Sequence, residues 1–232
     1  KVKENHNDDE KTRRKSQKVM ETAGKTGAAA NTLVKDVLRY DLNISNAITS
    51  VDNERGITDI VVGIKKGIVS DSLGRILENV LIESSVNAFV YSSVQPISTI
   101  KRHVVVIPEL IEREAGFIQV VNRLWNVISN TGTRMRFFGS TEAIAILQNF
   151  FKDKNCEVTY VEFDKWDDWR FLLREVRPDD MIWTLLSRKG GFSYVSVMSR
   201  VPRFLSRYLS AHSFVLAYPK QATVNEGTMY LT

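Results

Sequence analysis

Residues 58–91, TDIVVGIKKGIVSDSLGRILENVLIESSVNAFVY, decide the fold because they read as strand, loop, helix and strand. The apolar residues 60–62 end at Gly63, which is typical of a short strand buried on both faces. Asp71 or Ser72 can cap a helix, and apolar residues follow at helical spacing (Leu73, Ile76, Leu77, Val80 and Leu81). Residues 88–90 begin a second buried strand. A strand that ends in a glycine loop before a helix can bind an anion, because free backbone N–H groups and the helix dipole point there.

The loop after Gly63 carries the candidate ligand-binding groups. They are two lysines for charge, glycines for close backbone approach, and two hydroxyls: Lys65, Lys66, Gly67, Ser70, Ser72 and Gly74. We predict that a nucleotide or another anion, if the chain holds one, binds here. The alternative is a turn in which the glycines only satisfy backbone angles.

This stretch resembles the last strand, loop, helix and strand of the universal stress protein family. In the family a glycine ends the strand, a second follows after two residues, and a third, next to Ser or Thr, comes nine residues later. Here Gly67 follows Gly63 after three residues, and Gly74 follows after six more, beside Arg75. The outline of the motif is present, and its phosphate-binding detail is not. The resemblance implies an α/β fold with a doubly wound parallel sheet, like that of the adenine nucleotide alpha hydrolases.

The second half of the chain repeats landmarks of the first. Residues 59–62 match residues 180–183 at an offset of 121, and residues 88–91 match residues 213–216 at an offset of 125. Between them, the Lys-Gly pair at residue 66 recurs at an offset of 123. We therefore predict two tandem universal-stress-protein-like units, residues 1–98, N-terminally incomplete, and residues 99–232.

Apolar periodicity predicts five strands and four helices in the second unit. The strands are 103–107, 134–138, 157–163, 180–186 and 213–217, and the helices are 112–130, 140–151, 167–176 and 195–209. In the first half we predict a disordered segment or frayed helix start at 1–18, helices at 19–30 and 44–55, and a strand at 34–42. The family's strand order, 3-2-1-4-5, implies that the first unit lacks its strands one and two. Upstream residues, another subunit or a rearranged sheet would fill that gap. The last strands of both units, 88–91 and 213–218, are expected to pack on each other.

The composition fits a globular protein of one or two domains. Of the 232 residues 43% are hydrophobic, and the net charge of +5 is too small and dispersed to indicate a nucleic-acid partner. The single cysteine, Cys156, excludes an internal disulfide and a metal site built from cysteines. No apolar run approaches the roughly 20 residues that span a bilayer.

The second unit departs from the nucleotide-binding members of the family. Pro108 stands where the family has an aspartate, and the neighbouring Glu109 is the carboxylate that can reach a ribose. Its loop at 186–193 lacks the strand-end glycine, although Arg188 and Lys189 can attract an anion or simply face solvent. We therefore predict no ATP binding by this unit. A basic stripe of three arginines at helical spacing follows, suited to an acidic partner, anionic lipid or solvent: Arg200, Arg203 and Arg207.

No catalytic constellation or metal site stands out, so we do not predict an enzyme. The tandem arrangement resembles the soluble C-terminal region of some bacterial cation–proton antiporters. This implies a non-catalytic regulatory or interaction domain in the cytoplasm, tethered to the inner membrane through the transporter part of the same chain. A homodimer is a further expected partner. The alternative is a free-standing universal stress protein that binds ATP or AMP at the first-unit loop.

Overall fold

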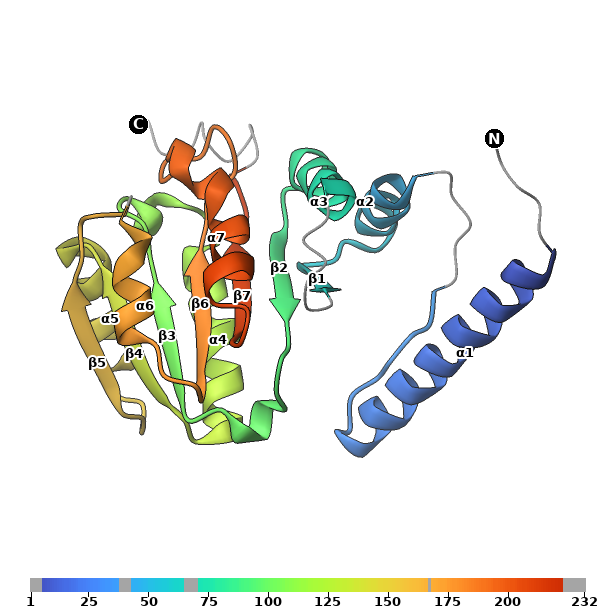
Figure 1. Ribbon diagram of the computed structural model, residues 1–232, viewed down its shortest axis with the longest axis horizontal. Helices are drawn as coiled ribbons and strands as arrows, with labels where there is room; N and C mark the ends of the chain where they lie inside the picture. Colours follow the sequence, from blue (N-terminus) through green and yellow to red (C-terminus); the bar gives the residue numbers. More distant parts are fainter. Residues whose placement is uncertain (1–5, 38–42, 65–70, 167, 223–232) are drawn as a thin grey trace. The chain divides into compact units, whose positions relative to one another are not determined.

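The computed structural model describes residues 6–37, 43–64, 71–166 and 168–222, in two units, Lys1–Leu42 and Asn43–Thr232. In the described residues the Asn43–Thr232 unit, called the sheet unit below, is built on one seven-stranded sheet of order β1-β2-β7-β6-β3-β4-β5 (Figure 1). The strands are β1 (Asp59–Ile64), β2 (Asn87–Ser92), β3 (Arg102–Val106), β4 (Arg134–Gly139), β5 (Val158–Glu162), β6 (Asp180–Leu185) and β7 (Ser213–Tyr218). All neighbours are parallel except β2 and β7. The predicted α/β class with a mainly parallel, doubly wound sheet is confirmed.

The five strands predicted for the second unit are β3 to β7. Their spatial order, β5-β4-β3-β6-β7, is the expected 3-2-1-4-5. The helices between them are α4 (Phe117–Thr131), α5 (Thr141–Phe151), α6 (Leu172–Glu175) and α7 (Val201–Tyr208). Gly132 ends α4 in the left-handed conformation with φ 64°, as its position in the sequence predicts.

Three predicted helices differ from the structure in their extent. The helix predicted at 112–130 begins only at Phe117, and a 3-10 turn, Ile111–Arg113, precedes it. The helix predicted at 167–176 is reduced to a 3-10 turn, Trp169–Phe171, and the single turn α6. The helix predicted at 195–209 starts as a 3-10 segment, Ser196–Arg200, before α7. Pro202 lies in the first turn of α7, where its missing N–H is not needed.

The two halves of the chain join where β2 pairs antiparallel with β7, which confirms the predicted contact between the last strands. The register is self-complementary. At the repeat offset of 125, Phe214 corresponds to Phe89 and Ala217 to Ser92, and the structure pairs Phe89 with Ala217 and Ser92 with Phe214. A two-fold axis between identical strands produces this pattern. The division between residues 98 and 99 stays a prediction.

The first half supplies two strands, β1 and β2, with α2 (Ile44–Arg55) before them and α3 (Asp71–Glu83) between them. Among the described residues, β1 has a sheet neighbour on one side only. The predicted N-terminal incompleteness of the first unit stays a prediction. The predicted strand at 34–42 is wrong for residues 34–37, which have no regular structure, and residues 38–42 lie outside the described residues. Residues 34–37 are exposed, so their side chains do not take part in a buried sheet.

The Lys1–Leu42 unit contains α1 (His6–Ala29), which is longer than the helix predicted at 19–30. Residues 6–18, predicted to be disordered or a frayed helix start, are helical. Lys, Arg, Glu and Gln have good helix propensity even without an apolar face. A pair at i, i+4 spacing, Glu21 with Lys25 at 2.6 Å, adds to this.

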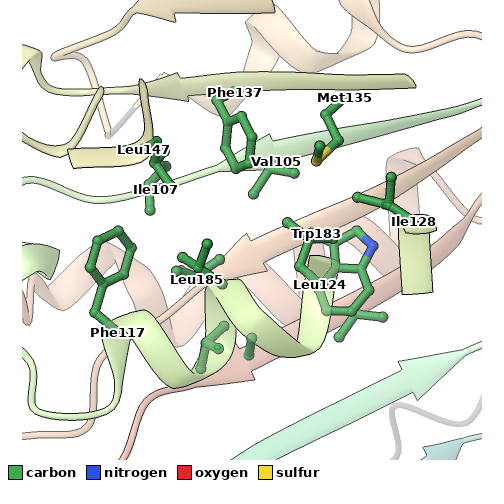
Figure 2. Close-up of a cluster of buried hydrophobic side chains, with 14 of the residues drawn as sticks. Val105, Ile107, Phe117, Leu124, Ile128, Met135, Phe137, Leu147, Trp183 and Leu185 are labelled. Atoms are coloured by element: carbon green, nitrogen blue, oxygen red, sulfur yellow. The ribbon is translucent and has the colours of Figure 1, made fainter. Parts of the chain in front are cut away.

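Side chains of the sheet alternate between two apolar layers. Met181, Trp183 and Leu185 of β6 face the layer that α4 and α5 cover, whereas Ile182 faces the layer of α3, α6 and α7. Figure 2 shows the first layer, in which α4 lays residues such as Leu124 against β6. Replacing a fully buried leucine of this kind with alanine costs about 2–5 kcal/mol. The tight layers fix the ends of β3 and β6, where the candidate site lies.

Candidate functional site

The strand order reverses between β3 and β6. The chain runs from β3 outward to β4 and β5, then returns to β6 beside β3 and continues outward to β7. In open α/β sheets, ligands bind outside the carboxyl ends of the strands at such a reversal. The loops that follow β3 (residues 107–116) and β6 (residues 186–195) therefore define the candidate site.

A buried glutamate, Glu114, lies between these two loops. Its Oε1 accepts hydrogen bonds from Ser187 Oγ at 2.7 Å, from the Ser193 backbone N–H at 3.0 Å and from Ser193 Oγ at 2.8 Å. Glu114 is 7% exposed, and the two serines are 5% and 3% exposed. We call Glu114, Ser187, Arg188 and Ser193 the Glu114 cluster. Its carboxylate lies at the strand reversal, between the loops that follow β3 and β6.

Two glycines shape the loop around this carboxylate. Gly190 has φ 88°, a left-handed conformation that favours glycine. At Gly191 a Cβ would lie 2.2 Å from Ser187 Oγ and 2.7 Å from Glu114 Oε1, so the backbone closes directly over the cluster. The basic glycine loop seen in the sequence is therefore built around an internal carboxylate.

Arg188 extends from the same loop into the first half of the chain. Its Nη1 donates to the Ser84 carbonyl at 2.7 Å, and its Nη2 donates to the Val86 carbonyl, in the turn between α3 and β2. Burial lowers the pKa of Arg188 to about 10, and the Glu114 charge acts in the opposite direction. The guanidinium therefore stays protonated at neutral pH. Arg188 is buried, in contrast to the exposed Lys189, so the two basic residues have different roles.

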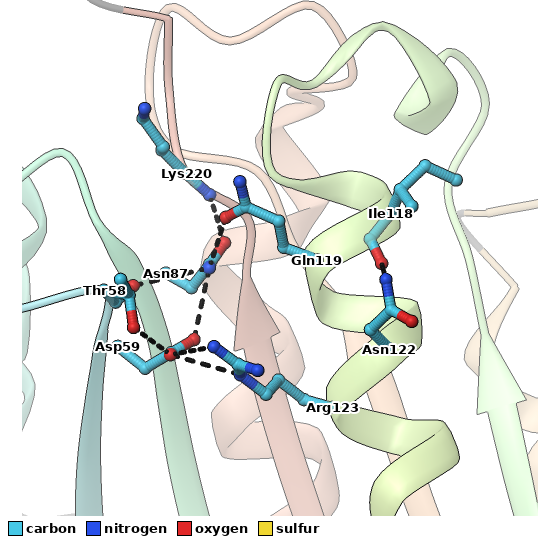
Figure 3. A network of polar contacts seen from close by, with 8 residues as sticks. All are labelled: Thr58, Asp59, Asn87, Ile118, Gln119, Asn122, Arg123 and Lys220. Carbon is cyan, nitrogen blue, oxygen red and sulfur yellow. Dashed lines mark hydrogen bonds and ion pairs between the residues drawn. The ribbon is translucent and has the colours of Figure 1, made fainter.

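A second polar network lies at the start of β2 (Figure 3). Asn87 is fully buried, and its Nδ2 donates to Gln119 Oε1 at 2.9 Å and Asp59 Oδ1 at 3.2 Å. Its Oδ1 accepts from the Lys220 backbone N–H at 2.8 Å. Burial acts to raise the pKa of Asp59, but the hydrogen bond from Arg123 and other bonds outweigh it and the pKa is lowered. This amide ties β1, α4 and the segment after β7 together.

The opposite edge, where β3 and β6 begin, carries structural polar pairs. Arg102 binds the fully buried Asp180 through Nε at 3.0 Å and Nη2 at 2.5 Å. Beside it, Trp183 Nε1 donates to His103 Nδ1 at 3.0 Å. Burial lowers the pKa of His103 to about 4, so the imidazole is neutral at pH 7. The four side chains thus form two pairs, Arg102 with Asp180 and Trp183 with His103.

The predicted first-unit loop is described only in part. Gly63 lies within β1, paired with Tyr91, and a Cβ there would meet no atom of the described residues within 4 Å. Ser72 and Gly74 lie in the first turn of α3. The remaining predicted residues lie outside the described residues: Lys65, Lys66, Gly67 and Ser70. A nucleotide or anion site at this loop stays a prediction.

Sequence reasoning missed Glu114, the central residue of the site. It singled out Pro108, which is buried, and Glu109, which is exposed. Glu114 was assigned to a helix that in fact begins at Phe117. The sequence signal for a later helix start is Gly116, directly before Phe117. In the structure a Cβ at Gly116 would lie 2.1 Å from the Lys220 nitrogen, so this close backbone contact requires glycine.

The void between α4 and the sheet measures about 10 Å³ and has an entirely apolar lining, including Val105, Phe117 and Leu185. A water needs a comparable volume and polar partners, so this void holds neither a ligand nor a bound water. In the described part of the chain no three His, Cys, Asp or Glu side chains gather closely enough to hold a metal ion. No described helix is both long and apolar enough to cross a membrane.

Comparison with known proteins shows a likeness of fold. The chain resembles the structure of a universal stress protein from Archaeoglobus fulgidus DSM 4304, with TM-score 0.59 and 17% identity over 95% of this chain and 81% of that one. It also resembles a protein of unknown function from Pseudomonas aeruginosa PAO1, with TM-score 0.56 and 7% identity over 88% of this chain and 78% of the other. No protein-family model and no curated protein matches the sequence. The fold is that of a universal-stress-protein-like α/β domain.

Proposed function

We propose that the chain is a non-catalytic regulatory or interaction domain, cytoplasmic and attached to a bacterial cation–proton antiporter at the inner membrane. The Glu114 cluster supports the first part of this proposal. At the strand reversal, where open α/β sheets bind their ligands, the protein's own carboxylate accepts hydrogen bonds from Ser187 and Ser193. A domain with its ligand position filled acts through its surface. The antiporter link rests on the sequence resemblance.

Nucleotide titration tests the closed site. We expect ATP or AMP, each with magnesium, to leave the melting temperature of the whole chain unchanged and to give no binding heat in calorimetry. A ligand that binds the native state stabilises it by about 2.7 kcal/mol at a hundredfold excess over Kd, so binding would be evident. A saturable shift would contradict the proposal.

The alternative function is nucleotide binding at the first-unit loop, and one substitution distinguishes the two sites. If a nucleotide stabilises the chain, Gly67→Val abolishes the effect when the loop at 63–74 is the site, because a side chain blocks close backbone approach. Binding that survives Gly67→Val places the nucleotide elsewhere.

Cell fractionation tests the attachment. An antibody raised against this chain is expected to detect a longer polypeptide in the membrane fraction, resistant to high-salt washing and released by detergent. A signal confined to the high-speed supernatant would favour the free-standing protein.

A further inference from the structure

The Glu114 cluster contains two buried charges that do not contact each other as an ion pair. Glu114 accepts from hydroxyl and amide donors, whereas Arg188 donates to the carbonyl groups of Ser84 and Val86. Both side chains are almost fully buried, at 7% and 5% exposure. The charges compensate each other through space, and Arg188 Nε has no hydrogen-bond partner among the described residues.

Loss of the Glu114 side chain would leave a set of groups that attract an anion. The hydroxyls of Ser187 and Ser193 and the Ser193 backbone N–H would lose their common acceptor. Arg188 would lose the largest of the charge interactions that favour its protonated form, although Asp52 would remain. Unsatisfied buried donors and a less well compensated buried cation both cost free energy, and a small oxyanion satisfies them together. The backbone of Gly191 already encloses this position.

We propose that the Glu114 carboxylate is a built-in ligand that holds the 186–193 loop in the conformation that a bound ligand would give it. This inference rests on the proposed function in one respect, that the site of the wild-type chain is closed to external ligands. The latent site accepts a small monocarboxylate such as formate or acetate, because the group that fills it is a carboxylate. Its donors are the serine groups that now bind Oε1. With the Glu114 carboxylate in place, a regulatory domain needs no diffusible ligand to keep the 186–193 loop ordered.

Chemical rescue of Glu114→Ala tests this proposal. Breaking a buried charged contact predicts a fall in melting temperature of roughly 6–20 °C for a chain of this size. We expect sodium formate or acetate to raise the melting temperature of Glu114→Ala by at least about 3 °C with saturation, whereas sodium chloride at equal ionic strength does not. The same salts on the wild-type chain give the general salt effect, which is subtracted.

Two matched variants complete the design. Glu114→Gln keeps an acceptor and the side-chain volume, so we expect a smaller loss and no rescue by carboxylates. Glu109→Ala removes an exposed glutamate of the same loop and should change neither stability nor the salt response.

Equal responses of Glu114→Ala to formate, acetate and chloride would overturn the proposal. If Glu114→Ala is insoluble, it is refolded in parallel with formate and with chloride. Recovery with formate alone supports the proposal, and equal recovery or failure in both refutes it. Nucleotide binding by the wild-type chain would contradict the proposed function, whereas absence of rescue in the variant contradicts the built-in ligand.

Discussion

Acidification should destabilise the fold through His103. This side chain is fully buried in β3, and its Nδ1 accepts the hydrogen bond from Trp183 Nε1 at 3.0 Å. The neutral tautomer therefore carries its proton on Nε2, which has no hydrogen-bond partner in the described part of the chain. A proton on Nδ1 would turn this acceptor into a donor and break the hydrogen bond from the indole N–H. Burial is the main reason that the pKa falls to about 4, and the nearby Asp180 charge opposes it.

The sign and size of the effect follow from proton linkage. Between pH 6.5 and pH 4 the unfolded state binds a proton at this histidine and the folded state does not, so stability rises with pH across this window. At 1.36 kcal/mol for each pKa unit, a shift of this size removes about 2 kcal/mol of unfolding free energy by pH 5 and about 3 kcal/mol by pH 4. The contribution is fully present above pH 6.5 and is lost as the pH falls.

Urea denaturation at pH 7.5, 6 and 5, followed by tryptophan fluorescence, measures this loss. Carboxylates also titrate in acid, so the wild-type chain is compared with His103→Asn, whose Oδ1 can accept from Trp183 and does not titrate. We expect the wild-type chain to lose about 2 kcal/mol more than the variant between pH 7.5 and 5. Parallel pH dependences would refute the assignment of a neutral buried imidazole.

Two further predictions, each with a matched control, follow from contacts elsewhere in the sheet unit. Arg102→Ala should cost about 3–5 kcal/mol of unfolding free energy in urea, because Asp180 stays buried without its cation, whereas Arg134→Ala, in an exposed pair, should cost less than about 1 kcal/mol. A result in which both variants lose the same amount would contradict the buried pair. Gly191→Ala should lower stability by about 1–3 kcal/mol in calorimetry, because its Cβ meets two oxygen atoms. Gly63→Ala, with open space around the Cβ, is the control and should lose less than about 1 kcal/mol.

The strands were the most predictable part of the fold. The runs at 103–107 and 180–186 consist of residues buried on both faces, so their lack of alternation identifies central parallel strands. Helix starts were less predictable. The boundary of α4 at Phe117 depends on a tertiary contact, the hydrogen bond from the Gly116 backbone N–H to the Lys220 carbonyl at 3.0 Å. Periodicity along one segment contains no information about such a partner.

The candidate site could not be derived from the sequence. The loop with Arg188 was recognised as basic and glycine-rich, yet its central group comes from residue 114, distant along the chain. Only the fold brings the end of β3 beside the end of β6. A family motif also directs attention to external ligands, and it cannot indicate that a side chain has taken the ligand's place.

The antiparallel joint between β2 and β7 sets the order in which the protein can be completed during synthesis. Phe89 and its partner Ala217 are neighbours in the sheet but lie 128 residues apart along the chain, so β2 leaves the ribosome long before β7 exists. Until then the apolar edge of β2 is open to other chains. The second half can assemble β3 to β6 in sequence, but β7 must pair with both β6 and β2. Closure of the sheet is therefore a late, long-range step. A nascent chain stalled before residue 213 would leave the backbone groups of β2 unpaired by β7 and open to aggregation, which chaperones would have to prevent.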